Sequence, residues 1–236
     1  MANSSKNLKN FFIRSSNTYT IGLGILIAAF ISVWMGWNYS YWLYLLGGAL
    51  LVVGLVIFFM GSVGKVDAAD IDKAVSDMLW EFDKDILEEP HYAKKMLPHV
   101  ENSLYLAHYD YDVEGILTKR YASSSSSAWY TSSYTAVRMF LLTDGIAFVR
   151  KTVDPILDTE DVQNGHYLYT DLANAEIVRQ QVKLNDLKRQ YTVTSARLII
   201  YKNDGSVVLS TSVNDDMESD NLAAHLTKLI AKAQEE

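Results

Sequence analysis

The chain has 236 residues, a net charge of −7 at pH 7 and no cysteine. The lack of cysteine excludes disulfides, thiolate metal ligands and thiol nucleophiles. Residues 1–64 carry a charge of +3, so the rest of the chain carries −10. An acidic module of this kind repels nucleic acid and anionic lipid, and we expect no nucleic-acid partner.

A basic N-terminal tail, residues 1–18, leads into a long uncharged segment. The tail carries Lys6, Lys9 and Arg14 and no acidic residue, whereas the fifty residues 15–64 carry no charged residue of either sign. In a protein that is 21% charged, a stretch of this length without charge indicates a membrane-embedded segment.

Residues 19–63 are predicted to form a transmembrane helical hairpin. Two apolar blocks, 19–37 and 41–63, can each cross a hydrocarbon core of roughly 30 Å at about 1.5 Å per helical residue. Because only residues 38–40 separate them, the two helices must be antiparallel neighbours. A cleaved signal peptide is the alternative for the first block, but a bulky aromatic segment follows it instead of an A-x-A site.

The charges that flank the hairpin predict its orientation. Lysine and arginine occur in the tail and at Lys65, while the turn between the helices has none, so we expect both termini in the cytoplasm. Aromatic residues gather around the turn, as is typical of the headgroup level on the opposite side. We therefore predict a multi-pass protein of the inner (plasma) membrane, with the lipid bilayer as its first partner.

Small residues form two stripes that allow close approach of membrane helices. Either the stripes close the hairpin, or one of them pairs protomers in a homo-oligomer. The second stripe keeps a seven-residue step, which holds one seam toward a partner and favours pairing between protomers. The stripes consist of Gly24, Ala28, Ser32 and Gly36 in the first helix and Gly47, Gly54 and Gly61 in the second.

Residues 64–112 are interpreted as an acidic helical stalk or connector. Apolar residues spaced three and four apart predict an amphipathic helix from Asp67 to Glu89, capped by Asp67 or Asp70. Its acidic face should be repelled by an anionic leaflet, and packing on the chain's own domain is favoured over a coiled coil. A second helical segment is predicted over 93–107.

The densest polar cluster of the chain, at the end of this connector, is His108, Asp110 and Asp112. Alternation places all three on one face, but acid–base catalysis would also need two of them to converge in a pocket with perturbed pKa values. Their role is left open. The spacing of His91, His99 and His108 matches no metal site, and we expect neither a metal nor another cofactor.

From residue 113 to residue 236 the sequence predicts an antiparallel β domain with a C-terminal helix. The hydrophobic period changes to two, and Asp-Gly pairs at 144–145 and 204–205 mark tight hairpin turns. The serine-rich stretch 123–127 and the three residues after it are interpreted as a long hairpin loop. Strands are expected at 114–121, 134–142, 146–152, 176–184, 190–201 and 207–213, and a helix at 219–233 capped by Ser219 or Asp220.

Residues 113–233 resemble bacterial pleckstrin-homology-like (PH-like) domains. The resemblance is carried by three segments, Phe140–Val149, Tyr167–Ile177 and Leu198–Leu209, and by the leucine-rich helix that follows them. It implies six or seven antiparallel strands closed by one C-terminal helix, and hence an α+β protein with a transmembrane hairpin, an acidic helix and a PH-like domain. The family also implies binding of peptides or proteins, self-association or attachment to envelope machinery, and it supplies no catalytic residues.

We therefore expect a membrane-anchored interaction or scaffold module that binds a protein or peptide partner, and not an enzyme. The alternatives are a membrane-associated enzyme built on the polar cluster and a lipid-headgroup-binding domain. The lipid-headgroup alternative depends on a basic patch that could bind a phosphate. The simpler explanation of this patch is a solvated strand face whose charges prevent pairing between sheet edges. The patch consists of Arg179, Lys183, Lys188 and Arg189.

Overall fold

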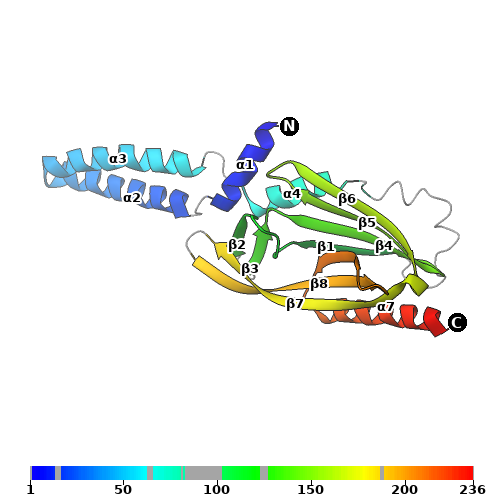
Figure 1. Ribbon diagram of the computed structural model, residues 1–236. Coiled ribbons are helices and arrows are strands. Elements are labelled where there is room, and N and C mark those ends of the chain that lie inside the picture. Colours follow the sequence, from blue (N-terminus) through cyan, green and yellow to red (C-terminus); the bar gives the residue numbers. More distant parts are fainter. Residues whose placement is uncertain are drawn as a thin grey trace. The chain divides into compact units, whose positions relative to one another are not determined.

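A computed structural model describes residues 2–13, 17–62, 66–80, 82, 103–122, 127–186 and 189–235. The protein is an α+β chain with two compact units, Met1–Asp70 and Ile71–Glu236. The first unit is helical, and the second contains antiparallel sheets and a C-terminal helix (Figure 1).

The described part of the first unit consists of three helices and the start of a fourth. Two of them are long and apolar enough to cross a membrane, in agreement with the two predicted blocks. Only 11% of the residues in each span are buried inside the protein, whereas the core helix of a water-soluble domain is mostly buried. The helices are α1 (Ala2–Ile13), α2 (Asn17–Asn38), α3 (Tyr41–Ser62) and α4 (Ala68–Met78).

Helices α2 and α3 pack through small residues spaced seven apart. A Cβ added to Gly22 would lie 2.6 Å from the amide nitrogen of Phe58, and one added to Gly47 would lie 2.7 Å from that of Val33. A side chain at either position would therefore force the two helices apart. The seam is made by Gly22, Ala29 and Gly36 on α2 and by Gly47 and Gly54 on α3.

Gly47 and Gly54 face α2 of the same chain, which favours the alternative in which the stripes close the hairpin over pairing between protomers. The four-residue stripe on α2 contributes to this packing only in part. An added Cβ on Gly24 would meet nothing within 4 Å and Ala28 is exposed, so these two residues lie outside the seam, whereas Gly36 belongs to it. When two helices wrap around each other, residues spaced seven apart stay in the contact on both helices. Residues spaced four apart drift out of the contact.

Among the described residues of the second unit, the strands form three antiparallel sheets. The four-stranded sheet has the order β1-β4-β5-β6, with β1 (Ser103–Tyr109), β4 (Tyr134–Leu141), β5 (Gly145–Asp154) and β6 (Thr159–Leu168). The three-stranded sheet has the order β7-β8-β9, with β7 (Leu172–Asp186), β8 (Arg189–Lys202) and β9 (Val207–Val213). A short 3-10 helix, η1 (Tyr169–Asp171), precedes β7, and β2 (Thr118–Ala122) pairs with β3 (Ser127–Thr131) as a separate hairpin.

The hydrophobic core is shared by the two larger sheets and the C-terminal helix α7 (Met217–Glu235). Fully buried side chains from each part meet in it, among them Met139 of β4, Leu198 of β8 and Leu226 of α7. Figure 1 shows α7 running along β7, where the Thr227 hydroxyl donates a hydrogen bond to the carbonyl oxygen of Ala175 at 2.8 Å. The beginning of α7 lies beside the end of β9 and the edge strand β1, since residues of all three line one hollow.

Several predicted elements differ from the structure. The predicted helix over 93–107 is corrected at its end, because residues 103–107 belong to strand β1, while 93–102 lie outside the described residues. The sheet therefore includes residues that the sequence analysis assigned to the connector. Helix α4 ends at Met78 instead of Glu89, with a turn at 79–80, and residues 83–89 lie outside the described part.

Two further strands are absent from the predictions. Strand β6 carries Thr, Glu, Asp, Gln, Asn and Gly, so its sequence lacks the apolar alternation by which strands are recognised. Strand β3 occupies 127–131, part of which was interpreted as loop; the serines at 123–126 lie outside the described residues. The predicted turn at Asp204-Gly205 is present, and Gly205 adopts a positive φ of 81°, which glycine tolerates without strain.

Candidate functional site

A groove runs between strand β1, at the edge of the four-stranded sheet, and the beginning of helix α7. Its volume of about 480 Å³ lies in the range of ligand-binding clefts. Leu104 and Leu106 of β1 and Leu222 of α7 supply apolar side chains that also pack against the core. The groove thus combines a strand at a sheet edge with an apolar floor that rigid elements hold in place.

The rim of this groove is acidic. Asp216 and Glu218 line it, together with the polar residues Asn214 and Ser219. Asp216 caps α7, since its Oδ1 accepts a hydrogen bond from the backbone N–H of Ser219 at 2.9 Å. The predicted cap, Ser219 or Asp220, was therefore wrong. This backbone hydrogen bond lowers the pKa of Asp216, which therefore stays ionised at neutral pH.

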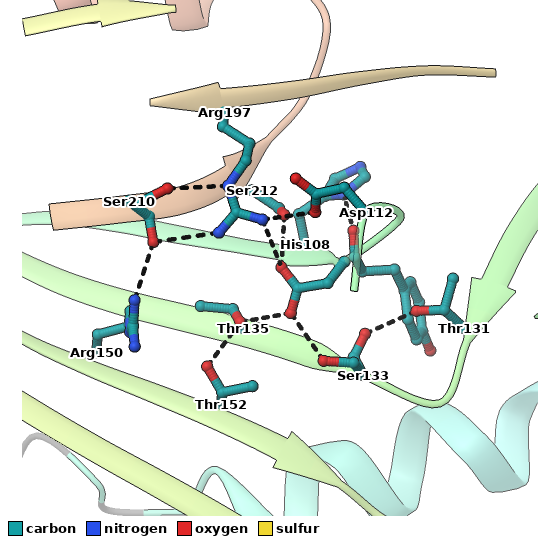
Figure 2. Close-up of polar contacts among 12 residues, drawn as sticks. His108, Asp112, Thr131, Ser133, Thr135, Arg150, Thr152, Arg197, Ser210 and Ser212 are labelled. Carbon is teal, nitrogen blue, oxygen red and sulfur yellow. Dashed lines mark hydrogen bonds and ion pairs between the residues drawn. The ribbon is translucent and has the colours of Figure 1, made fainter. Parts of the chain in front are cut away.

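The buried polar cluster that forms around Asp110 lies elsewhere. Asp110 is 2% exposed, and its carboxylate accepts hydrogen bonds from Ser133 at 2.9 Å, Thr135 at 2.6 Å and Ser212 at 2.6 Å. Ser133 and Thr135 lie at the start of β4 and Ser212 lies on β9 (Figure 2). The carboxylate therefore links the four-stranded sheet to the three-stranded sheet.

Arg197 of β8 completes this cluster. Its Nη1 lies 2.6 Å from Asp112 and 3.9 Å from Asp110, and its Nε donates to the Ser210 hydroxyl at 2.9 Å. Gln180 also donates to Asp112, at 3.0 Å. A buried carboxylate with three hydroxyl donors and a guanidinium nearby has its hydrogen-bonding capacity filled by the protein. The cluster therefore holds the fold together and offers no group to a substrate.

His108 does not join the two aspartates. Its Nδ1 lies 2.8 Å from the carbonyl oxygen of Tyr109, and its ring meets the edge of Tyr111 at 5.2 Å between centroids. The structure thus brings Asp110 and Asp112 together through Arg197 and leaves His108 out of the cluster. The contacts described here give no support to an acid–base pair.

The residues of the predicted basic patch are spread along β7 and β8. Arg179 binds Asp215 at 2.7 Å and Asp220 at 2.9 Å, so it fastens the beginning of α7 to β7. Arg189 lies opposite Asp186 in the strand register at the hairpin end, and Asp186 is seven residues from Arg179 along β7, or about 23 Å. Lys183 lies between them, opposite Thr192, and Lys188 lies outside the described residues.

Metal-ligating groups do not gather in the part of the chain that the structure describes: no three His, Asp or Glu residues there could hold an ion. His91 and His99 lie outside that part. The groove, by contrast, was missed by the sequence analysis. The run Leu104, Tyr105 and Leu106 fits a strand, but it lies within the range that was predicted as a helix. We find no other sequence signal for this groove.

No protein-family model, curated protein or solved structure matches the chain. Its function therefore has to be argued from its own sites and not from a relative.

Proposed function

We propose that the protein is a membrane-anchored interaction module whose β domain binds an extended segment of a protein partner in the groove between β1 and α7. The hairpin of α2 and α3 would anchor it in the inner membrane with both termini in the cytoplasm, as the flanking positive charges favour. Recognition of an extended peptide at a sheet edge combines main-chain pairing with pockets for alternate side chains.

The observation that carries this proposal is the groove itself. It has leucine side chains on its floor, two carboxylates on its rim and a sheet-edge strand along one wall. An extended segment that alternates apolar and basic residues fits this arrangement, because its apolar side chains would cover the leucines and its cations would meet Asp216 and Glu218. Self-association through a strand of a second copy is the alternative occupant.

The strand order supports the PH-like resemblance. Four antiparallel strands, β1-β4-β5-β6, are followed by three, β7-β8-β9, and then by one C-terminal helix that shares their core. This is the layout that the resemblance implies, with the β2-β3 hairpin as an addition between the first two strands of the larger sheet. Peptide and protein binding is among the functions that this family implies.

Among the described residues, the contacts of the predicted polar cluster and of the predicted basic patch favour neither alternative function. The enzyme hypothesis depends on a cluster whose carboxylate is filled by protein donors. The lipid-headgroup hypothesis depends on a patch in which Arg179 is held by two aspartates. We therefore propose a binding function and no catalytic one.

The test measures binding of two labelled octapeptides, one alternating valine and lysine and the other alternating valine and glutamate, to the full chain in nanodiscs. Fluorescence anisotropy should detect the lysine peptide and not the glutamate peptide. Glu218→Lys should raise its Kd by up to about fivefold, since an exposed ion pair contributes roughly 0.2–1 kcal/mol. Glu235→Lys, the same change at the far end of α7, is the control and should leave the Kd unchanged.

Equal binding of both peptides, or equal weakening by the two substitutions, would show that the attraction is non-specific and would contradict the proposal. Binding of neither peptide, together with a concentration-dependent dimer that Glu218→Lys dissolves, would assign the groove to a second copy.

A further inference from the structure

A second hollow lies on the other side of β1, between this strand, β4 and helix α4. Its volume is about 420 Å³, and it belongs entirely to the second unit. Tyr105 of β1 lines both this cavity and the groove, whereas its neighbours Leu104 and Leu106 line the groove alone. The cavity is lined by Asp72, Val75, Ser76, Leu79, Trp80, Tyr105 and Tyr134.

Asp72 supplies the negative charge of this cavity, and two phenols hold it in position. The Tyr109 hydroxyl donates to Oδ1 at 2.9 Å, and the Tyr130 hydroxyl donates to Oδ2 at 3.3 Å. Both donors are neutral, so they orient the carboxylate without cancelling its charge. Burial, assisted by Asp72, raises the pKa of Tyr109 and Tyr130, and burial raises that of Tyr134 to about 12, so these phenols remain protonated at neutral pH.

Aromatic rings form much of the remaining wall. Trp80, Tyr105 and Tyr134 line the cavity, and the ring of Tyr134 packs against that of Tyr109 at 4.8 Å between centroids. The face of an aromatic ring attracts cations, and Tyr105 already has the guanidinium of Arg138 at 5.5 Å from its centroid. A carboxylate and several aromatic rings around one hollow form the arrangement that recognises organic ammonium ions.

We propose that this cavity binds an organic ammonium group, such as the trimethylammonium of choline. A single carboxylate gives too few ligands for a metal ion, whereas an ammonium group needs one counter-charge and the ring faces. An anion would be repelled by Asp72, and a wholly apolar ligand would leave that charge without a partner. The site shares Tyr105 with the peptide groove, while Asp72, Trp80 and Tyr134 line this cavity only.

The test places 5-fluorotryptophan at the five tryptophan positions of the full chain in phosphatidylglycerol nanodiscs and follows the ¹⁹F resonances. Choline chloride should shift the Trp80 resonance saturably, while Trp129, which lies against Tyr191, should not respond. Asp72→Asn keeps an acceptor for a phenol but removes the charge, and it should raise the Kd for choline about tenfold. Asp77→Asn, on an exposed part of α4 outside the cavity, is the matched control and should change nothing.

Nanodiscs of phosphatidylcholine distinguish the two sources of such a group. A Trp80 resonance that is already shifted there and no longer responds to free choline would identify a lipid headgroup as the ligand. The same response in both lipids would identify a soluble ammonium compound. A Trp80 resonance that follows sodium chloride as closely as choline chloride, or an Asp72→Asn protein with undiminished affinity, would overturn the proposal.

Discussion

Two carboxylates in the β domain, Asp110 and Asp72, accept hydrogen bonds from hydroxyl groups, yet their surroundings differ. Asp110 is buried, with three hydroxyl donors and Arg197 at 3.9 Å. Asp72 is exposed on α4, has two phenol donors and faces a cavity with aromatic walls. One carboxylate is closed off by the protein, and the other is oriented but still open.

The difference shows that a cluster of polar residues in a sequence does not by itself mark a functional site. His108, Asp110 and Asp112 are close in sequence, but the two aspartates bind side chains of neighbouring strands and thereby join those strands. In the sequence, nothing distinguishes Asp72 from the other acidic residues of α4. It acquires its aromatic neighbours only through folding. Whether a carboxylate is structural or available for binding is decided by how many donors surround it and whether water can reach it.

The largest effect is expected from Asp110→Ala, which would leave the hydroxyls of Ser133, Thr135 and Ser212 without this acceptor, while Arg197 keeps Asp112. Each buried polar group left unsatisfied costs about 1–3 kcal/mol, so the free energy of unfolding should fall by at least that amount. Asp72→Ala should cost less than about 1 kcal/mol, because its hydrogen bonds are exposed. Urea unfolding of the detergent-solubilised chain, followed by near-ultraviolet circular dichroism, measures both. Similar losses for the two variants would remove the distinction between a closed and an open carboxylate.

The helical hairpin offers the same contrast between a closed and an open position. A Cβ on Gly54 would lie 2.9 Å from the side chain of Leu26, whereas one on Gly48 would meet nothing within 4 Å. Gly54→Leu should therefore overpack the seam at a cost of about 1–3 kcal/mol, and Gly48→Leu should not.

The measurement for the hairpin uses a cysteine pair, since the chain has none of its own. Tyr19 and Phe58 lie in ring contact at 4.7 Å between centroids, so cysteines at these two positions should crosslink within one chain on mild oxidation. Gly54→Leu should lower the yield, and Gly48→Leu should leave it unchanged. Crosslinks that form only between chains would instead assign the seam to an oligomer.

A further effect is expected at high pH. Burial raises the pKa of Tyr111 and of Tyr134 to about 12, whereas a tyrosine in the unfolded chain titrates near 10. Between pH 10 and pH 12 the unfolded state therefore binds fewer protons than the folded state, so stability should fall as pH rises through this window and not below it.

Absorbance of phenolate at 295 nm, recorded together with urea midpoints at each pH, tests this expectation. Tyr134→Phe should make the fall less steep, because it removes one of the shifted phenols from the cavity. A stability that stays constant up to pH 12 would mean that the rings around Asp72 are as accessible to water as free tyrosine.

Parts of the fold could be predicted from the sequence because their signals are local. The uncharged segment 15–64 identified two apolar helices, and apolar alternation with Asp-Gly turns identified β4, β5, β8 and β9. Strand β6 was missed because its side chains are mostly polar and exposed, so it carries no periodic apolar signal. An edge strand can do without that signal, since pairing with β5 supplies its hydrogen bonds.

The sequence by itself determined the length and apolar character of the helical hairpin, the acidic charge of the remaining chain and most strand positions, since these depend on composition and short-range period. Only the tertiary structure decided which glycines face each other, that Arg179 serves Asp215 and Asp220, and that Tyr105 and Tyr134 meet Asp72 across more than thirty residues. Such contacts depend on strand register and helix rotation, where a shift of one residue turns a side chain to the opposite face.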